Sequence, residues 1–163
     1  MAMRRVRVIG CGSPDGADDA AGLLAARAAA RRLAGVPGME VVEAGPAIRV
    51  LDLLAGVDAV VAVDAVRTRG GARPPGRLVR VDGDADVLGR ALPGTASSHG
   101  VGLADVVRLG AALGFAPQVV FVGVEAGRVG AGAGLSAEVR RALPALVSMV
   151  EAEALSLSEE VRR

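Results

Sequence analysis

The chain has 163 residues, of which 52% are hydrophobic and 23% charged, and its formal net charge is +1. This length and composition are typical of one folded domain, expected over residues 1–163, and they exclude a disordered chain. The near-neutral charge, with two Phe and no Trp or Tyr, argues against a nucleic-acid partner. No uncharged apolar run reaches the roughly 18–20 residues that cross a membrane, and the apolar stretch after the first residues is too short for a signal peptide. We therefore expect a soluble, cytoplasmic protein with no membrane partner.

The hydrophobic pattern of the first half predicts strands and helices in alternation. The predicted elements are strands over 6–9, 39–43 and 58–64, a helix from Asp18 or Asp19 to about Leu33, and a short helix over 48–54. The strand over 58–64 is apolar on both faces, as a central strand of a parallel sheet must be.

The second half continues the alternation. We expect an edge strand over 77–81, and mostly loop with at most one helical turn over 82–100. After these we expect a helix from Gly102 to about Leu113, a strand over 119–122, a helix from Ala137 to Leu155, and a frayed polar tail over 156–163. This order predicts an α/β fold, a three-layer α/β/α sandwich around a mostly parallel five-stranded sheet with one antiparallel edge strand.

Polar residues follow several of the predicted strands. Asp18 and Asp19 come soon after the first strand, Asp64 ends the third, and His99 precedes a helix. Ligands of such sheets bind at the carboxyl ends of the strands, and two carboxylates with an imidazole suit a metal ion. Each residue also has a structural interpretation: Asp18 as a helix N-cap, Asp64 as an acceptor for the next turn, and His99 as a packed histidine.

Other chemistries have weaker support. Cys11 and His99 are the only cysteine and the only histidine, which excludes disulfides within the chain, zinc ribbons and motifs with two histidines. A dinucleotide loop would need glycine where Asp15 stands, and the chain has no Lys for a phosphate-binding loop. Cys11 with His99 and Asp64 would form a thiol hydrolase, although a cysteine between two glycines is more often core filler.

Four segments together resemble the nickel–iron hydrogenase maturation proteases. They read GCGSPDGADD over 10–19, VDA over 63–65, SSHGVGLAD over 97–105, and GVEA over 123–126, which is followed by LS at 135–136. Ser13 stands where the family usually has Asn, and Ala126 where it commonly has Pro. Asp19 binds the metal under this resemblance, and Asp18 caps the helix or braces the loop.

The resemblance implies an endopeptidase that removes the C-terminal extension of a hydrogenase large-subunit precursor after nickel insertion. It gives Asp19, Asp64 and His99 the metal-recognition and catalytic roles, and the nickel arrives within the precursor. Two alternatives stay open: a non-enzymatic nickel-binding accessory protein on the same fold, and a small nucleotide-binding α/β domain.

Overall fold

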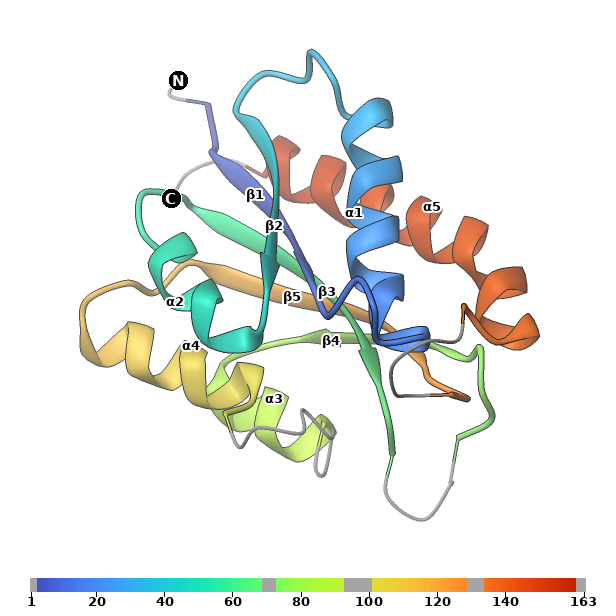
Figure 1. Cartoon of the computed structure of the whole chain (residues 1–163). Helices are drawn as coiled ribbons and strands as arrows, with labels where there is room; N and C mark the ends of the chain where they lie inside the picture. Colours follow the sequence, from blue (N-terminus) through green and yellow to red (C-terminus); the bar gives the residue numbers. More distant parts are fainter. Residues whose placement is uncertain (1–2, 69–72, 93–100, 129–133, 161–163) are drawn as a thin grey trace.

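A five-stranded sheet runs through the middle of the protein (Figure 1). The computed structural model describes residues 3–68, 73–92, 101–128 and 134–160. The strands are β1 (Val6–Cys11), β2 (Met39–Gly45), β3 (Ala59–Val66), β4 (Leu78–Asp82) and β5 (Gln118–Glu125). Their order is β2-β1-β3-β5-β4, and only β4 is antiparallel to its neighbour. The predicted sheet, with its one antiparallel edge strand, is confirmed.

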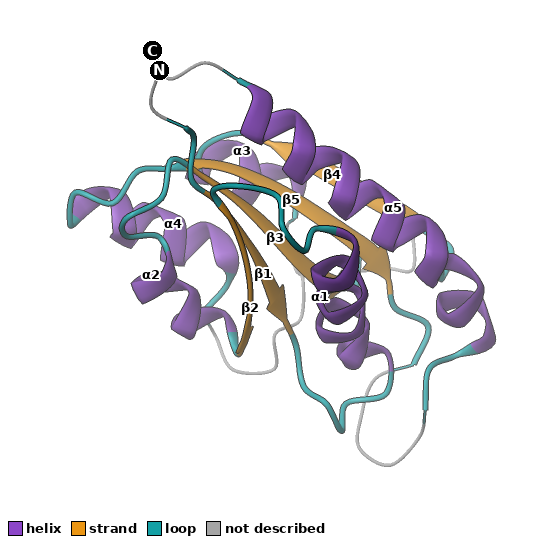
Figure 2. Cartoon of the chain, turned by 90° about the horizontal axis from the view of Figure 1, so that it is seen from above, coloured by secondary structure: helices purple, strands orange, loops and turns teal. Residues whose placement is uncertain are grey.

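Helices cover both faces of this sheet (Figure 2). The described helical segments are η1 (Asp18–Ala20), α1 (Ala21–Arg32), η2 (Ala47–Arg49), α2 (Val50–Leu53), α3 (Ala85–Ala91), α4 (Leu103–Ala112) and α5 (Ala137–Glu159). α1 and α5 pack on one face, and α2, α3 and α4 on the other. The three-layer α/β/α prediction is therefore confirmed, and no helix in the described residues is long and apolar enough to span a membrane.

Each face of the sheet buries its own apolar core because neighbouring strand residues point in opposite directions. In β3, Val61 and Val63 pack toward α1 and α5, whereas Val60 and Ala62 pack toward α2 and α4. All four side chains are fully buried. A strand that is apolar from Ala59 to Val63 thus lies at the centre of the sheet, as its sequence predicts.

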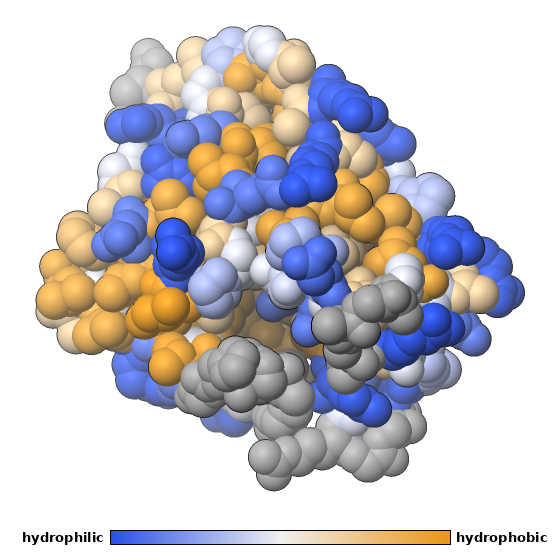
Figure 3. Space-filling view, in the orientation of Figure 1, coloured by the Kyte–Doolittle hydropathy of each residue, from blue (hydrophilic) through white to orange (hydrophobic). Residues whose placement is uncertain are grey.

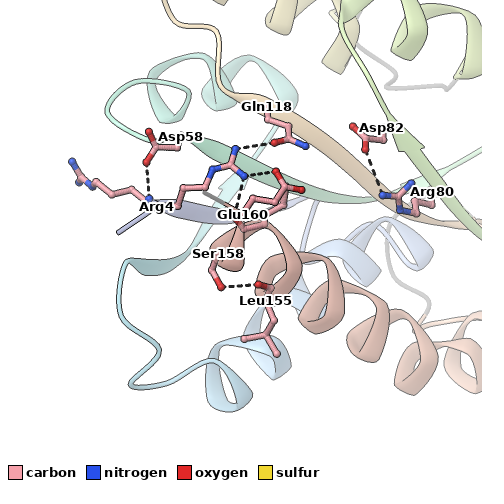
Figure 4. A network of polar contacts seen from close by, with 10 residues as sticks. Arg4, Asp58, Arg80, Asp82, Gln118, Leu155, Ser158 and Glu160 are labelled. Atoms are coloured by element: carbon pink, nitrogen blue, oxygen red, sulfur yellow. Dashed lines mark hydrogen bonds and ion pairs between the residues drawn. The ribbon is translucent and has the colours of Figure 1, made fainter. Parts of the chain in front are cut away.

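Two predicted boundaries are wrong. α5 continues to Glu159 instead of fraying from Ser156, because Leu157 is buried in the core and its carbonyl accepts a hydrogen bond from Arg4. Arg4 also pairs with Glu160 and Gln118, which ties the end of α5 to the sheet (Figure 4).

The stretch expected to be mostly loop with at most one helical turn contains α3, a helix of 7 residues over 85–91. The Asp84 carboxylate caps this helix by accepting hydrogen bonds from the backbone N–H groups of Asp86 and Val87. A short helix becomes stable here because Leu88 is fully buried against the α2–α4 face of the sheet.

α1 begins unusually close to β1 and β3, and Gly22 makes that approach possible. A Cβ at Gly22 would lie 2.3 Å from the carbonyl oxygen of Cys11, 2.5 Å from that of Val63 and 2.9 Å from the Cα of Asp64. All three are backbone atoms, so no side chain can rotate away to make room. Gly22 therefore sets the distance between the helix and the sheet beside Asp64.

The substitution Gly22→Ala should lower the free energy of unfolding by more than about 2 kcal/mol, because the added methyl overpacks the helix–sheet contact. Urea denaturation measures the effect. Gly89→Ala is the matched control, since its Cβ would meet only Ala104 at an ordinary 3.7 Å. That control should stabilise the protein by about 0.5–1 kcal/mol through helix propensity. Equal effects of the two substitutions would contradict the close approach.

Candidate functional site

Two acidic residues lie together at the carboxyl ends of β1 and β3. Asp19 belongs to η1, which follows β1, and Asp64 lies near the end of β3, the parallel neighbour of β1. Gly12 lies close to both residues: a Cβ at this position would lie 3.5 Å from Oδ1 of Asp64 and 1.9 Å from the carbonyl oxygen of Asp19. The backbone of Gly12 has φ 125°, which also favours glycine. The first loop therefore folds tightly over Asp64.

The protonation of this pair is shifted from the ordinary behaviour of aspartate. The pKa of Asp64 is raised to about 7. Burial is the largest cause, the hydrogen bond from the N–H of Ala65 partly offsets it, and the negative charge of Asp19 adds to it. Burial and the charge of Asp18 likewise raise the pKa of Asp19. Two carboxylates in such a site repel one another when both are ionised, and a cation between them would relieve that repulsion.

His99, the third predicted ligand, lies outside the described residues. Within the described part of the chain, no three His, Cys, Asp or Glu side chains gather to hold a metal ion. The structure therefore brings together Asp19 and Asp64. The metal-binding and catalytic roles of Asp19, Asp64 and His99 stay predictions.

Asp18 binds a different part of the chain from the pair. Its side chain is completely buried and accepts four hydrogen bonds. The backbone N–H groups of Gly127, Arg128 and Ser136 lie 2.8, 2.7 and 2.7 Å from its oxygens, and the Ser136 hydroxyl lies at 2.8 Å. Burial alone would raise its pKa, but the bonds from Ser136, Arg128 and Gly127 outweigh burial and hold the pKa below its ordinary value.

The N-cap interpretation of Asp18 is wrong, because the N-cap position of η1 is Ala17 and no side chain caps that turn. Asp18 instead braces the first loop against the segment between β5 and α5. The loop is also strained at Ala17, whose φ of 55° is rare for a residue with a side chain.

A model of one protein family, described as HycI hydrogenase maturation protease, matches residues 24–153. The chain belongs to the hydrogenase maturation protease family. The matched range includes Asp64 and His99, whereas Asp18 and Asp19 precede it. A search of the curated protein sequences found no match.

Several solved structures of similar fold are described as hydrogenase maturation proteases. The maturating endopeptidase HybD of E. coli is 23% identical with a TM-score of 0.78, and the alignment covers 93% of each chain. The [NiFe] hydrogenase maturation protease HybD of Thermococcus kodakarensis is 28% identical with a TM-score of 0.73, over 92% of this chain and 99% of that one. HycI of the same archaeon is 23% identical with a TM-score of 0.72, over 95% and 94%.

Two further polar residues, at the end of β5 and at the start of α5, are buried in this maturation protease, and the sequence pattern did not reveal their partners. Glu125, at the end of β5, is 2% exposed and accepts hydrogen bonds from the N–H and the hydroxyl of Thr68. Ser136 is the N-cap of α5 and donates its hydroxyl to Asp18. A serine ahead of an apolar helix is a readable N-cap signal, but no pattern in the sequence pairs it with Asp18.

Cys11 does not have the surroundings of a catalytic thiol. Its side chain is 3% exposed and packs in the core on the α2–α4 face. Burial, and to a smaller extent the charge of Asp64, raise the pKa of the Cys11 thiol well above its usual value. A thiol that stays protonated is a poor nucleophile, so the core-filler interpretation accounts for Cys11 and the thiol-hydrolase hypothesis does not.

The substitution Asp18→Ala should destabilise the protein by about 2–4 kcal/mol at pH 7, because it leaves buried donors of Ser136 without an acceptor. An ionised Asp18 stabilises the fold above the ordinary Asp pKa of about 3.9, and this contribution is lost as the pH falls below that value. The difference between the two proteins should therefore shrink in acid. Chemical denaturation between pH 3 and pH 8 measures it.

Asp15→Ala serves as the control, because Asp15 is exposed in the same loop. An Asp18→Ala protein as stable as the Asp15→Ala protein at pH 7 would refute the bracing role.

The substitution Asp64→Asn should stabilise the protein at neutral pH, in contrast to Asp18→Ala. A carboxyl whose pKa is raised on folding destabilises the fold once the unfolded chain ionises, so the penalty is absent below about pH 3.8, grows toward pH 7 and is constant above it. The neutral amide should leave stability unchanged near pH 3.5 and raise it by about 1–3 kcal/mol at pH 8. Denaturation in the presence of a chelator tests this, and a loss of stability at pH 8 would contradict the raised pKa.

Proposed function

We propose that this protein is an endopeptidase that removes the C-terminal extension from the large-subunit precursor of a nickel–iron hydrogenase after nickel has been inserted. The observation that carries the proposal is the carboxylate pair of Asp19 and Asp64 at the carboxyl rim of the sheet, in a chain that belongs to the maturation protease family. The proposal includes the cytoplasm as the place of the reaction.

The pair suits recognition of a cation that enters with the substrate. Carboxylate oxygens and an imidazole nitrogen are ordinary ligands of divalent transition metals. Asp19 and Asp64 supply the oxygens, and His99 is the proposed nitrogen ligand. The nickel belongs to the precursor, so binding brings its positive charge to two acids whose pKa values are raised while no cation is present.

Asp64 also suits proton transfer during peptide hydrolysis. A carboxylate accepts a proton only in its ionised form, and the cation that enters with the precursor favours that form of Asp64. When a water oxygen attacks the scissile carbonyl carbon, a carboxylate at this position takes the proton from the water. The same proton then passes to the amine of the leaving segment as the C–N bond breaks.

Incubation with nickel-loaded large-subunit precursor tests the proposal. The wild-type protein should shorten that precursor and leave the nickel-free precursor intact. Asp19→Asn and Asp64→Asn should each lower the cleavage rate at least about 100-fold, the lower end of what a general acid–base group contributes. Mass spectrometry of the released extension measures the rate.

Two controls separate the site from general damage. Asp52→Asn removes an exposed acid from α2, and Cys11→Ala removes the buried thiol, so both should leave most of the activity. Full cleavage by Asp19→Asn would overturn the site. Nickel-dependent binding of the precursor by the wild-type protein without any cleavage would favour the accessory-protein alternative, and His99→Ala should abolish that binding.

A further inference from the structure

A groove of about 480 Å³ lies on the outer side of the loop that carries Asp19. The side chains of Leu23 and Leu24 from α1 and of Leu135 from the segment ahead of α5 give it an apolar lining. Asp15 and Arg27 are the charged residues among those that line it. Its volume lies within the range of pockets that bind small molecules or a few side chains of a peptide.

The groove adjoins the carboxylate pair through the first loop. Ala17 and Ala20 line it, and Asp19 lies between them in the chain. The Asp19 side chain lies toward Gly16, where a Cβ would be 2.7 Å from the Cβ of Asp19. The groove and the carboxylate pair therefore share the first loop.

The groove carries one uncompensated charge. Arg27 is neutralised by Glu43 of β2, with 2.8 Å between the guanidinium and the carboxylate. Asp15 is exposed and makes no hydrogen bond or ion pair with any other described residue. The lining is therefore apolar with an unpaired negative charge at Asp15, which complements an apolar side chain next to a basic one. The exposed guanidinium of Arg140 donates a hydrogen bond to the carbonyl oxygen of Leu135.

The wall of the groove is held in place by the brace described above. Leu135 directly precedes Ser136, whose N–H and hydroxyl both bind the buried Asp18 carboxylate. Asp18 is in turn the neighbour of Asp19. One buried carboxylate therefore fixes the spacing between the groove wall and the carboxylate pair, so that the groove and the pair form one surface.

We propose that this groove binds the precursor polypeptide beside the scissile bond, with an apolar side chain against Leu24 and Leu135 and a basic side chain at Asp15. This inference rests on the proposed function. A second apolar surface extends over α2 and α4 (Figure 3) and includes Leu109 and Leu113, which are 44% and 56% exposed. It lies on the other face of the sheet from α1 and serves here as the comparison surface.

Cysteine protection locates the bound precursor. The only native cysteine is 3% exposed, so a maleimide pulse should label the wild-type protein slowly and report on a cysteine placed elsewhere. Leu24→Cys and Arg27→Cys place a thiol in the groove, and Leu113→Cys places one on the comparison surface. Because the Arg27 side chain is 54% exposed, its replacement preserves folding even where replacement of Leu24 does not.

Alkylation is measured within the first turnover after excess nickel-loaded precursor is added. The precursor should slow alkylation at positions 24 and 27 at least about tenfold. The rate at position 113 should stay within about twofold. Unchanged rates at 24 and 27 while the wild-type protein cleaves the same precursor would overturn the groove and leave the proposed function intact. Slowed rates without any cleavage would support the groove and count against the peptidase.

The charge is tested separately. Asp15→Lys should raise KM for the precursor about tenfold or more and leave kcat within about twofold, because Asp15 binds the chain and does not touch the reacting atoms. For a precursor whose basic residues beside the scissile bond are replaced by Glu, the wild-type protein should have the higher KM and the Asp15→Lys protein the lower one. Equal KM values for the two proteases with both precursors would refute the role of Asp15.

Discussion

The buried carboxylate of Asp18 is the constraint on which the functional end of this protein depends. It joins the loop after β1 to two points of the segment between β5 and α5, and each of its oxygens accepts hydrogen bonds. An ionised group without partners in such a place would cost several kcal/mol, so the loop and both points of that segment have to keep the geometry that supplies its donors. Asp19 follows it directly, and its position is therefore fixed by a residue whose own side chain binds the segment between β5 and α5.

Asp18 and Asp64 have different roles because their carboxylates accept different numbers of hydrogen bonds. Asp18 has four donors, and its pKa lies below the ordinary value, so it is a permanent anion at neutral pH. Asp64 has one backbone donor and lies near Asp19, and its pKa rises to about 7. The first environment stabilises the fold and the second destabilises it. An acid held at such a cost is typical of a functional site, because binding of a cation returns the lost free energy.

The sequence predicted those parts of the structure that depend on local pattern. β3 is apolar at consecutive positions because both of its faces are buried, and Asp64 follows at its carboxyl end, where neighbouring parallel strands bring Asp19 near. It did not predict features that depend on distant partners. The last turn of α5 is held by Arg4, and the first loop is held by Ser136, 118 residues from Asp18. The groove escaped prediction for the same reason, since α1 and the segment ahead of α5 meet only in the folded chain.

Under the proposed function, this arrangement makes recognition depend on two features of the precursor at once. The carboxylate pair needs a cation to relieve its repulsion, whereas the groove needs an apolar and basic stretch of polypeptide. A precursor without nickel satisfies only the groove, and a free metal ion satisfies only the pair. Because Asp18 fixes the spacing between the two, a chain bound at both points is held with its backbone across Asp19. Cleavage then requires the metal and the peptide together, and a protease built in this way spares both the unfinished precursor and unrelated proteins.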